Sequence, residues 1–326
     1  MNRLPLGADG PRVSRLCLGT WPLSGLWGGG IEPAVHAVRR AFDLGVNFFD
    51  TARAYGDGAA EAALARGLGD LVRTHRSELV IVTKGGLRIQ GNSVVRDCDP
   101  EVLRSGLVAS LSALGTDYVD LFLVHWPDPT IPLAETAGVL AGFVEEGLVR
   151  RTGVSNFTAG QMAEFGPAAV AQVPYSLLAR GVERDVLPYC RAAGVPVMGW
   201  ASLAHGLLTG ALRPGHTFAP DDWRAYSPVF RGERLAAVAT AVDRLAAVAA
   251  DRGISVAQLA LAWVLHQPAG VVPIFGAQEP EHVEDSVRAL EVRLDEAELA
   301  ELGRLVEGAP PVLPDTEPPH RAPAGV

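Results

Sequence analysis

Eight short apolar runs, each suited to a buried strand, alternate along the chain with stretches whose apolar residues recur at helical spacing. The runs end at Thr20, Asp50, Lys84, His125, Asn156, Gln172, Trp200 and Phe275. Units of this kind build parallel sheets, because each helix carries the chain back to the start of the next strand. Eight units predict a closed (β/α)8 barrel, the TIM barrel.

The rival fold is a doubly wound open sheet, which needs a GxGxxG turn after its first strand when it binds a dinucleotide. The loop 21–30 is rich in glycine, but Pro33 stands where the last glycine of that motif would fall. The closed barrel is therefore favoured, and we expect this loop to border a pocket.

Two elements are expected outside the repeat. Leu4 to Arg15 surrounds the turn sequence Ala8-Asp9-Gly10-Pro11 and predicts an N-terminal β-hairpin. Asp295 to Val306 predicts one extra amphipathic helix at the other end. Between them, residues 87–99 are expected to form a polar loop and residues 201–232 a long excursion.

We expect one barrel domain over residues 1–306 and a Pro-rich tail over residues 307–326. From Gly308 to Val326 the chain has six prolines and few apolar residues, a composition typical of a solvated segment. A tail that folds over the mouth of the barrel is the alternative.

Composition excludes several classes of function. The net charge is −9 and no basic run occurs, which argues against nucleic acid or an anionic membrane as the main partner. The start lacks the pattern of a signal peptide, and no window is long and apolar enough for a membrane span. The three cysteines are widely spaced, and neither CxxC nor HExxH is present, so we expect no metal site and a cytoplasmic protein.

Polar side chains at three successive strand ends point to chemistry. Asp50 ends one run, with Tyr55 five residues later, and Lys84 and His125 end the next two. In a barrel of this kind the carboxyl ends of the strands carry the active site. A phenol is a weak acid, with an ordinary pKa of about 10, and a lysine ammonium beside it would favour the phenolate. We therefore expect Tyr55 to exchange a proton, Lys84 to assist it, and Asp50 to hold Lys84.

With these residues assembled, the chain resembles the aldo-keto reductases over about residues 3 to 306. The matching segments are Phe49-Asp50-Thr51-Ala52 with Tyr55-Gly56, Thr83-Lys84, Leu123-Val124-His125-Trp126-Pro127-Asp128, Gly153-Val154-Ser155-Asn156-Phe157 and Gly206-Leu207-Leu208-Thr209-Gly210. The resemblance implies a (β/α)8 barrel that interconverts an aldehyde or ketone and its alcohol with a nicotinamide cofactor. It assigns the catalytic tetrad to Asp50, Tyr55, Lys84 and His125, with His125 orienting the substrate carbonyl.

The resemblance also implies a cofactor site. It assigns Ser155, Asn156 and Gln172 to the nicotinamide carboxamide, and Trp200, where many relatives have tyrosine, to stacking on the ring. The full expected set is Thr20, Trp21, Asp50, Ser155, Asn156, Gln172, Trp200, Leu203, Gly206, Gly276, Gln278, His282, Asp285 and Ser286.

The adenine end of this expected site departs from the family. Relatives that prefer the phosphorylated cofactor usually have basic residues for the 2′-phosphate, whereas this chain has Gln278 and His282, with Glu279 between them. Ser286 stands in place of a common asparagine. NADP(H) is the family default, and NAD(H) is the alternative that these residues favour, because a dianionic phosphate beside Glu279 has no fixed cation.

The substrate pocket is expected to contain Trp21, Trp27, Tyr55, Trp126 and Trp223, with Arg224 and Tyr226 nearby. Aromatic walls suit sugars and aryl carbonyls alike. The segment 224–231 is either a lid or a plain surface loop.

Two other functions stay open. One is an NAD-dependent dehydrogenase of aldoses or sugar alcohols, for which the weak phosphate pocket is the hint. The other is a non-catalytic sensor of the nicotinamide cofactor that resembles the potassium-channel β subunits. The intact tetrad argues against the sensor. The sequence identifies neither an oligomeric partner nor the physiological substrate.

Overall fold

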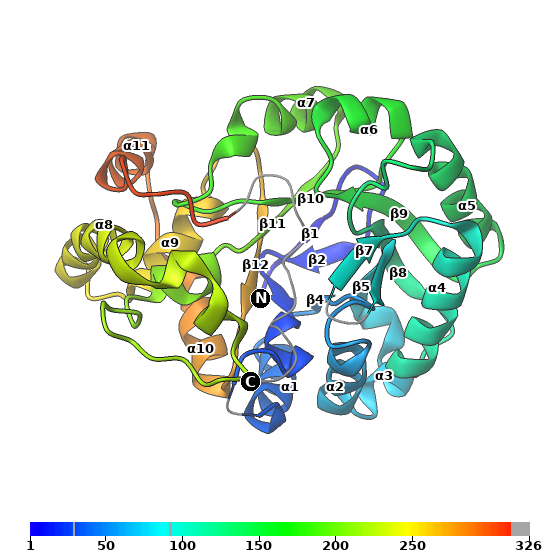
Figure 1. Ribbon diagram of the computed structural model, residues 1–326, viewed down its shortest axis with the longest axis horizontal. Coiled ribbons are helices and arrows are strands. Elements are labelled where there is room, and N and C mark those ends of the chain that lie inside the picture. Colours follow the sequence, from blue (N-terminus) through cyan, green and yellow to red (C-terminus); the bar gives the residue numbers. More distant parts are fainter. Residues whose placement is uncertain (29, 91–92, 314–326) are drawn as a thin grey trace.

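The computed structural model describes residues 1–28, 30–90 and 93–313. Its centre is a closed barrel with the strand order β10-β11-β12-β3-β4-β5-β8-β9, and every neighbouring pair is parallel (Figure 1). The strands are β3 (Cys17–Gly19), β4 (Phe48–Asp50), β5 (Val80–Gly85), β8 (Val119–Val124), β9 (Val149–Ser155), β10 (Ala171–Pro174), β11 (Val197–Trp200) and β12 (Val272–Gly276). The predicted (β/α)8 barrel is confirmed.

Helices surround the strands (Figure 1). They are α1 (Glu32–Asp43), α2 (Ala59–Leu68), α3 (Leu71–Thr74), α4 (Pro100–Leu114), α5 (Leu133–Glu145), α6 (Ala159–Phe165), α7 (Val186–Ala193), α8 (Gly232–Asp251), α9 (Val256–Leu265), α10 (Pro280–Arg288) and α11 (Glu296–Leu305). Short 3-10 helices are η1 (Trp21–Ser24), η2 (Arg76–Glu78), η3 (Gly181–Glu183), η4 (Ala204–Thr209), η5 (Trp223–Tyr226), η6 (Pro228–Phe230) and η7 (Ala289–Glu291). The helix expected at the end of the repeat is α11.

The start of α4 illustrates how local sequence sets a helix boundary. The Asp99 side chain accepts hydrogen bonds from the backbone N–H groups of Glu101 and Val102, which have no partner within the helix. Pro100 follows in the first turn, where its missing N–H costs nothing. Gly115 ends the helix with a φ of 66°, a left-handed conformation that glycine adopts without a steric penalty.

The strands are continuous apolar runs because both of their faces are buried. In β5, Val80 and Val82 belong to a cluster inside the barrel, whereas Ile81 belongs to the layer between strands and helices. The alternation follows from the two-residue period of a strand, whose successive side chains point to opposite faces. The same period fixes which polar residues at the strand ends enter the barrel.

Two antiparallel hairpins accompany the barrel. The expected N-terminal hairpin pairs β1 (Arg3–Pro5) with β2 (Arg12–Ser14), and Leu6 and Val13 join the inner apolar cluster. After β5, β6 (Leu87–Gln90) pairs with β7 (Ser93–Arg96). The prediction of a polar loop there was therefore wrong. Leu87 and Ile89 are less exposed than the residues that follow each of them, which is the alternation of a strand.

The structure bears on the expected lack of a membrane span and on the predicted C-terminal tail. Within the described ranges no single helix is long and apolar enough to cross a membrane; α8 and α9 pass by length and composition only as a pair bent by 91°. Residues 314–326, most of the predicted Pro-rich tail, lie outside the described residues. The domain limits of 1–306 and 307–326 stay a prediction.

Two helical glycines offer a matched test of the packing. A Cβ at Gly67 in α2 would lie 2.6 Å from the Val38 Cβ and 2.7 Å from the Val35 carbonyl oxygen of α1, whereas one at Gly106 in α4 would meet nothing within 4 Å. Gly67→Ala should lower the free energy of unfolding by about 1–3 kcal/mol through overpacking. Gly106→Ala should raise it by about 0.5–1 kcal/mol, because alanine favours a helix over glycine. Urea unfolding of both variants measures the difference, and a Gly67→Ala protein as stable as the parent would contradict the close α1–α2 contact.

Candidate active site

Strand periodicity brings three polar side chains into the mouth of the barrel. Asp50, Lys84 and His125 each follow, by two positions, a residue of the inner apolar cluster, namely Phe48, Val82 and Leu123. Since side chains two residues apart share a face, all three point inward at the carboxyl ends of β4, β5 and β8. Their neighbourhood is dry: Lys84 is 1% exposed and Asp50 is 2% exposed.

The Lys84 ammonium is held by three hydrogen bonds. It donates to the Asp50 carboxylate at 2.8 Å, to the Thr51 carbonyl oxygen at 2.8 Å and to the Tyr55 hydroxyl oxygen at 3.3 Å. An ammonium has three donors, so all of its donors are used. The Tyr55 oxygen accepts from Lys84, which leaves the phenolic hydrogen free to be donated elsewhere.

Burial and charge act in opposite directions on this pair. Burial is the largest single effect and would lower the pKa of Lys84, but the Asp50 carboxylate and the Tyr55 oxygen together outweigh it, so the pKa is raised and the amine stays protonated. Burial raises the pKa of Tyr55, and the Lys84 ammonium opposes that shift without overcoming it. The expected lowering by Lys84 is thus present but smaller than the effect of burial. Tyr55 is a protonated phenol with a cation at its oxygen.

The loop that carries Tyr55 depends on glycine. Gly56, Asp57 and Gly58 all have left-handed φ values, of 64°, 54° and 88°. A Cβ at Gly56 would lie 2.3 Å from the Ser24 carbonyl oxygen in η1, so no larger residue fits there. The Tyr55 ring stacks on Trp21 with a centroid distance of 6.2 Å and meets His125 edge to face at 5.6 Å.

His125 is a neutral imidazole. Burial lowers its pKa well below the usual 6.5, and the Lys84 ammonium adds to the shift. Its Nδ1 atom is buried and has no partner among the residues that the structure describes. A neutral ring can donate from one nitrogen and accept at the other.

Amide side chains support these groups from β10 and from the residue that follows β9. The Gln172 amide donates to the second Asp50 oxygen at 2.7 Å. Asn156, with a φ of 62°, donates to the His125 carbonyl oxygen at 3.0 Å and to the Ser155 hydroxyl at 3.0 Å, and accepts from the Trp200 indole N–H at 3.1 Å. This network fixes the plane of the Trp200 ring.

A cavity of about 480 Å³ opens beside Tyr55. From the expected cofactor set its wall contains Trp21, Asp50, Trp200, Leu203, Gly206, Gly276, Gln278, His282, Asp285 and Ser286, and from the expected substrate set Trp27 and Tyr55. The cavity wall does not include Thr20, Lys84, His125, Ser155, Asn156 and Gln172. Thr20, Lys84 and Gln172 contact Asp50, His125 contacts Tyr55, Asn156 bonds to the Gln172 backbone, and Ser155 bonds to Asn156. Most of the residues that the sequence assigned to a site thus lie around the cavity beside Tyr55.

Three tryptophans form an aromatic cluster at one side of this cavity. Trp21 stacks on Trp223 at 5.0 Å and meets Trp27 edge to face at 5.5 Å. Trp223 itself is not on the wall but supports it. Trp126, also expected in the pocket, is 6% exposed and lies against the Arg96 guanidinium at 5.1 Å, and it is not among the described residues that line the cavity.

Sequence reasoning did not select His205, whose ring lines the cavity and lies 5.1 Å from both Trp21 and Trp223. His205 lies between Leu203 and Gly206, both of which the sequence assigned to the cofactor site. Its position next to the segment Gly206 to Gly210 was the signal that could have found it. Nearby, Arg224 forms a buried ion pair with Asp222 at 2.6 Å and is therefore not a free cation.

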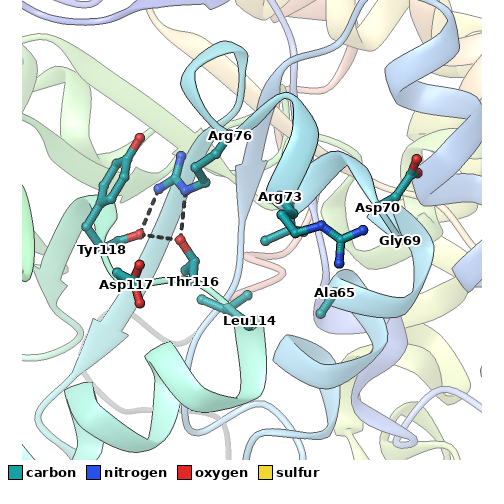
Figure 2. A pocket seen from close by; sticks show the side chains of 11 residues that line it. Ala65, Gly69, Asp70, Arg73, Arg76, Leu114, Thr116, Asp117 and Tyr118 are labelled. Carbon is teal, nitrogen blue, oxygen red and sulfur yellow. Dashed lines mark hydrogen bonds between the residues drawn. The ribbon is translucent and has the colours of Figure 1, made fainter.

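A second cavity, of about 420 Å³, lies at the opposite end of β5 and β8 (Figure 2). Its main cation, Arg76, is fully engaged: it donates to the Thr116 hydroxyl and the Tyr118 carbonyl oxygen and pairs with Asp120 at 2.8 Å. In barrels of this type that face serves stability. The buried Asp50, Lys84 and Tyr55 lie instead at the carboxyl ends of the strands, beside the first cavity. No group of His, Cys, Asp and Glu able to hold a metal occurs in the described part of the chain.

Comparison with known proteins agrees with this geometry. The model of the aldo/keto reductase family matches residues 15–307. The chain is 36% identical to aldo-keto reductase YhdN of Bacillus subtilis (strain 168) over 290 residues, covering 87% of each protein. It is 31% identical over 327 residues to the NADH-specific methylglyoxal reductase of Escherichia coli (strain K12), covering 94% of this chain and 99% of the relative.

Solved structures give the same result. The glycerol dehydrogenase AKR11B4 from Gluconobacter oxydans has a TM-score of 0.83 at 33% identity, covering 95% of this chain and 96% of that one. An aldo-keto reductase from Klebsiella pneumoniae in complex with NADPH has a TM-score of 0.71 at 31% identity, covering 94% and 95% of the two chains.

His205 should make the protein less stable in mild acid. Burial lowers the pKa of His205 to about 3, and the Arg224 guanidinium contributes. The unfolded chain takes up a proton below about pH 6.5, whereas the folded chain does so only near pH 3, so this stability is complete above pH 6.5 and is lost as the pH falls. Between pH 7.5 and pH 5, His205→Gln should lose about 2 kcal/mol less free energy of unfolding than the parent. Urea unfolding at both pH values tests this, and equal losses would contradict a neutral buried His205.

Proposed function

The chain belongs to the aldo/keto reductase family and is an oxidoreductase, and we propose that it interconverts an aldehyde or ketone and its alcohol with Tyr55 as general acid and base. The observation that supports this role is the hydrogen bond from the Lys84 ammonium to the Tyr55 oxygen, on the wall of the cavity and beside Asp50.

A bound nicotinamide cofactor supplies the hydride in reduction and accepts it in oxidation. As the new C–H bond forms, the carbonyl π electrons move to oxygen, which takes the phenolic proton of Tyr55. The Lys84 ammonium stabilises the phenolate that remains, and Asp50 holds Lys84 in place. The neutral His125 ring donates a hydrogen bond that orients the carbonyl. In the oxidation direction the same groups act in reverse.

The residues present fit a nicotinamide cofactor. The Gln172 amide oxygen has no partner among the described residues, and Ser155 and Asn156 lie in the same network, so these side chains would hold the carboxamide. Trp200 presents its ring to the cavity, where it would stack on the nicotinamide. The cavity then continues past Leu203, Gly206 and Gly276 to the start of α10, which would hold the rest of the cofactor.

The adenine end supports use of both cofactors. Asp285 accepts from Ser255 at 2.7 Å and from Gln258 at 2.6 Å, so it is already committed within the protein. Among the described residues on the cavity wall Arg224 is the single arginine, and it is paired with Asp222. Neither group offers a free cation to a 2′-phosphate, which favours NAD(H), so we propose NADP(H), the default of the family, with NAD(H) as the alternative. One relative is NADH-specific and one similar structure holds NADPH.

The names of the relatives suggest both reaction directions, since one is a methylglyoxal reductase and one is a glycerol dehydrogenase. We propose a small-molecule carbonyl or alcohol as the substrate. The cysteines at 17, 98 and 190 are buried free thiols, which supports the expectation of a reducing, cytoplasmic compartment.

Tyr55→Phe should lower kcat by about 10²–10⁴-fold, because it removes the proton donor and leaves the ring in place. Cofactor binding, followed by quenching of tryptophan fluorescence by NADPH, should persist. Turnover of 4-nitrobenzaldehyde measures the loss. Tyr118→Phe, at the opposite end of the barrel, is the matched control. Near-normal turnover by Tyr55→Phe would refute its role, and a parent protein that binds NADPH without turnover would favour the cofactor sensor.

Gln278→Arg should shift the protein toward NADPH. A guanidinium at this position would face the 2′-phosphate, so the KM for NADPH should fall about tenfold while the KM for NADH changes little. The gain should shrink as salt rises. Steady-state kinetics with both cofactors measures it, and Gln267→Arg, in the connection between α9 and β12, is the control. An equal change for NADH and NADPH would place the 2′-phosphate elsewhere.

A further inference from the structure

His205 shares the cavity with Tyr55. Its ring lies 5.1 Å from Trp21, which in turn stacks on Tyr55 at 6.2 Å, and 6.2 Å from Trp200. The imidazole therefore stands between the aromatic cluster and the tryptophan assigned to the nicotinamide. A group bound in this cavity would meet both Tyr55 and His205 on its wall.

This imidazole lacks hydrogen-bond partners. The residue is 9% exposed, and its neighbours are the rings of Trp21, Trp27, Trp200 and Trp223. Neither ring nitrogen has a partner among the residues described by the structure. A polar group enclosed by apolar rings is unfavourable unless something bonds to it, and here the only open side is the cavity. The imidazole nitrogens are therefore available to a polar group of a molecule that enters the cavity.

The backbone places the ring in this position at a conformational cost. Ala204 and His205 have φ values of 47° and 55°, and Gly206 follows with 95°. Non-glycine residues in this region are held by their surroundings, and they concentrate at functional sites. The Arg224 guanidinium, fixed by Asp222, donates to the His205 carbonyl oxygen at 3.3 Å and supports the unusual backbone.

We propose that His205 is a substrate-binding residue that hydrogen-bonds a second oxygen function close to the reacting carbonyl. The preferred substrates are then small hydroxyaldehydes, hydroxyketones or dicarbonyls rather than plain alkyl aldehydes. A neutral imidazole suits them, because it can donate to a carbonyl oxygen and either donate to or accept from a hydroxyl. Trp21 and Trp27 line this side of the cavity and Trp223 packs against them, and bulky rings in such a wall favour a short substrate. This inference rests on the proposed function.

Three aldehydes with the same carbon skeleton test it: propanal, glyceraldehyde and methylglyoxal. The parent protein should show a kcat/KM at least tenfold higher for the two oxygenated aldehydes than for propanal. His205→Phe keeps a flat ring and removes both nitrogens, so the ratio of kcat/KM for glyceraldehyde to that for propanal should fall about tenfold or more. His205→Gln keeps a donor and an acceptor and should retain more of the ratio than His205→Phe.

The outcomes separate the two proposals. If the ratio is unchanged in both variants, or if the KM for NADPH rises while the ratio stays, His205 does not bind substrate and the inference fails. If the parent reduces propanal as well as the oxygenated aldehydes, the inference alone fails. A parent that reduces none of the three, nor 4-nitrobenzaldehyde, overturns the proposed function as well. His75→Phe, on an exposed residue at the opposite end of the barrel, controls for a general effect of replacing histidine with phenylalanine.

Discussion

The ion pair between Lys84 and Asp50 governs the arrangement of the site. A charged amine inside an apolar barrel is unfavourable unless its charge is matched and its donors are used. Asp50 supplies the charge from the neighbouring strand, the Thr51 carbonyl oxygen takes a second donor, and Gln172 fixes the carboxylate from β10. The third donor reaches the Tyr55 oxygen, so the same bonds that make the buried charge tolerable also define where the phenol lies.

Much of this site could be predicted from sequence, because alternate side chains of a strand point to the same face. Once β5 is recognised as a buried strand, the direction of Lys84 follows from that of Val82, and the same holds for Asp50 and His125 in their strands. The order of strands around a (β/α)8 barrel then makes the convergence of these side chains a matter of topology. Neither step needs knowledge of distant contacts.

What sequence patterns missed depends on tertiary contacts or on short elements. The β6–β7 hairpin has four-residue strands, too short for alternation to outweigh the polar composition of the segment. Helix α6 has only seven residues, and its clearest signal is the capping box formed by Thr158 and Gln161. His205 has one signal in sequence, the nearby glycine motif, but its contacts do not show there, because Trp21 and Trp27 come from the loop after β3 and Trp223 lies 18 residues further along its own loop. Burial also raises the pKa of Tyr55, and the extent of burial cannot be derived from a sequence motif.

The close approach of Gly56 to Ser24 couples two parts of the cavity wall. The backbone of the loop after β4 contacts the Ser24 carbonyl group in the loop after β3, and no side chain separates the two. These loops carry Trp21 and Tyr55, so the two side chains keep a fixed position relative to each other. An outward movement of the loop with Trp21 would also displace the loop that positions Tyr55. Widening the entrance and preserving the alignment of the acid are competing demands in this architecture.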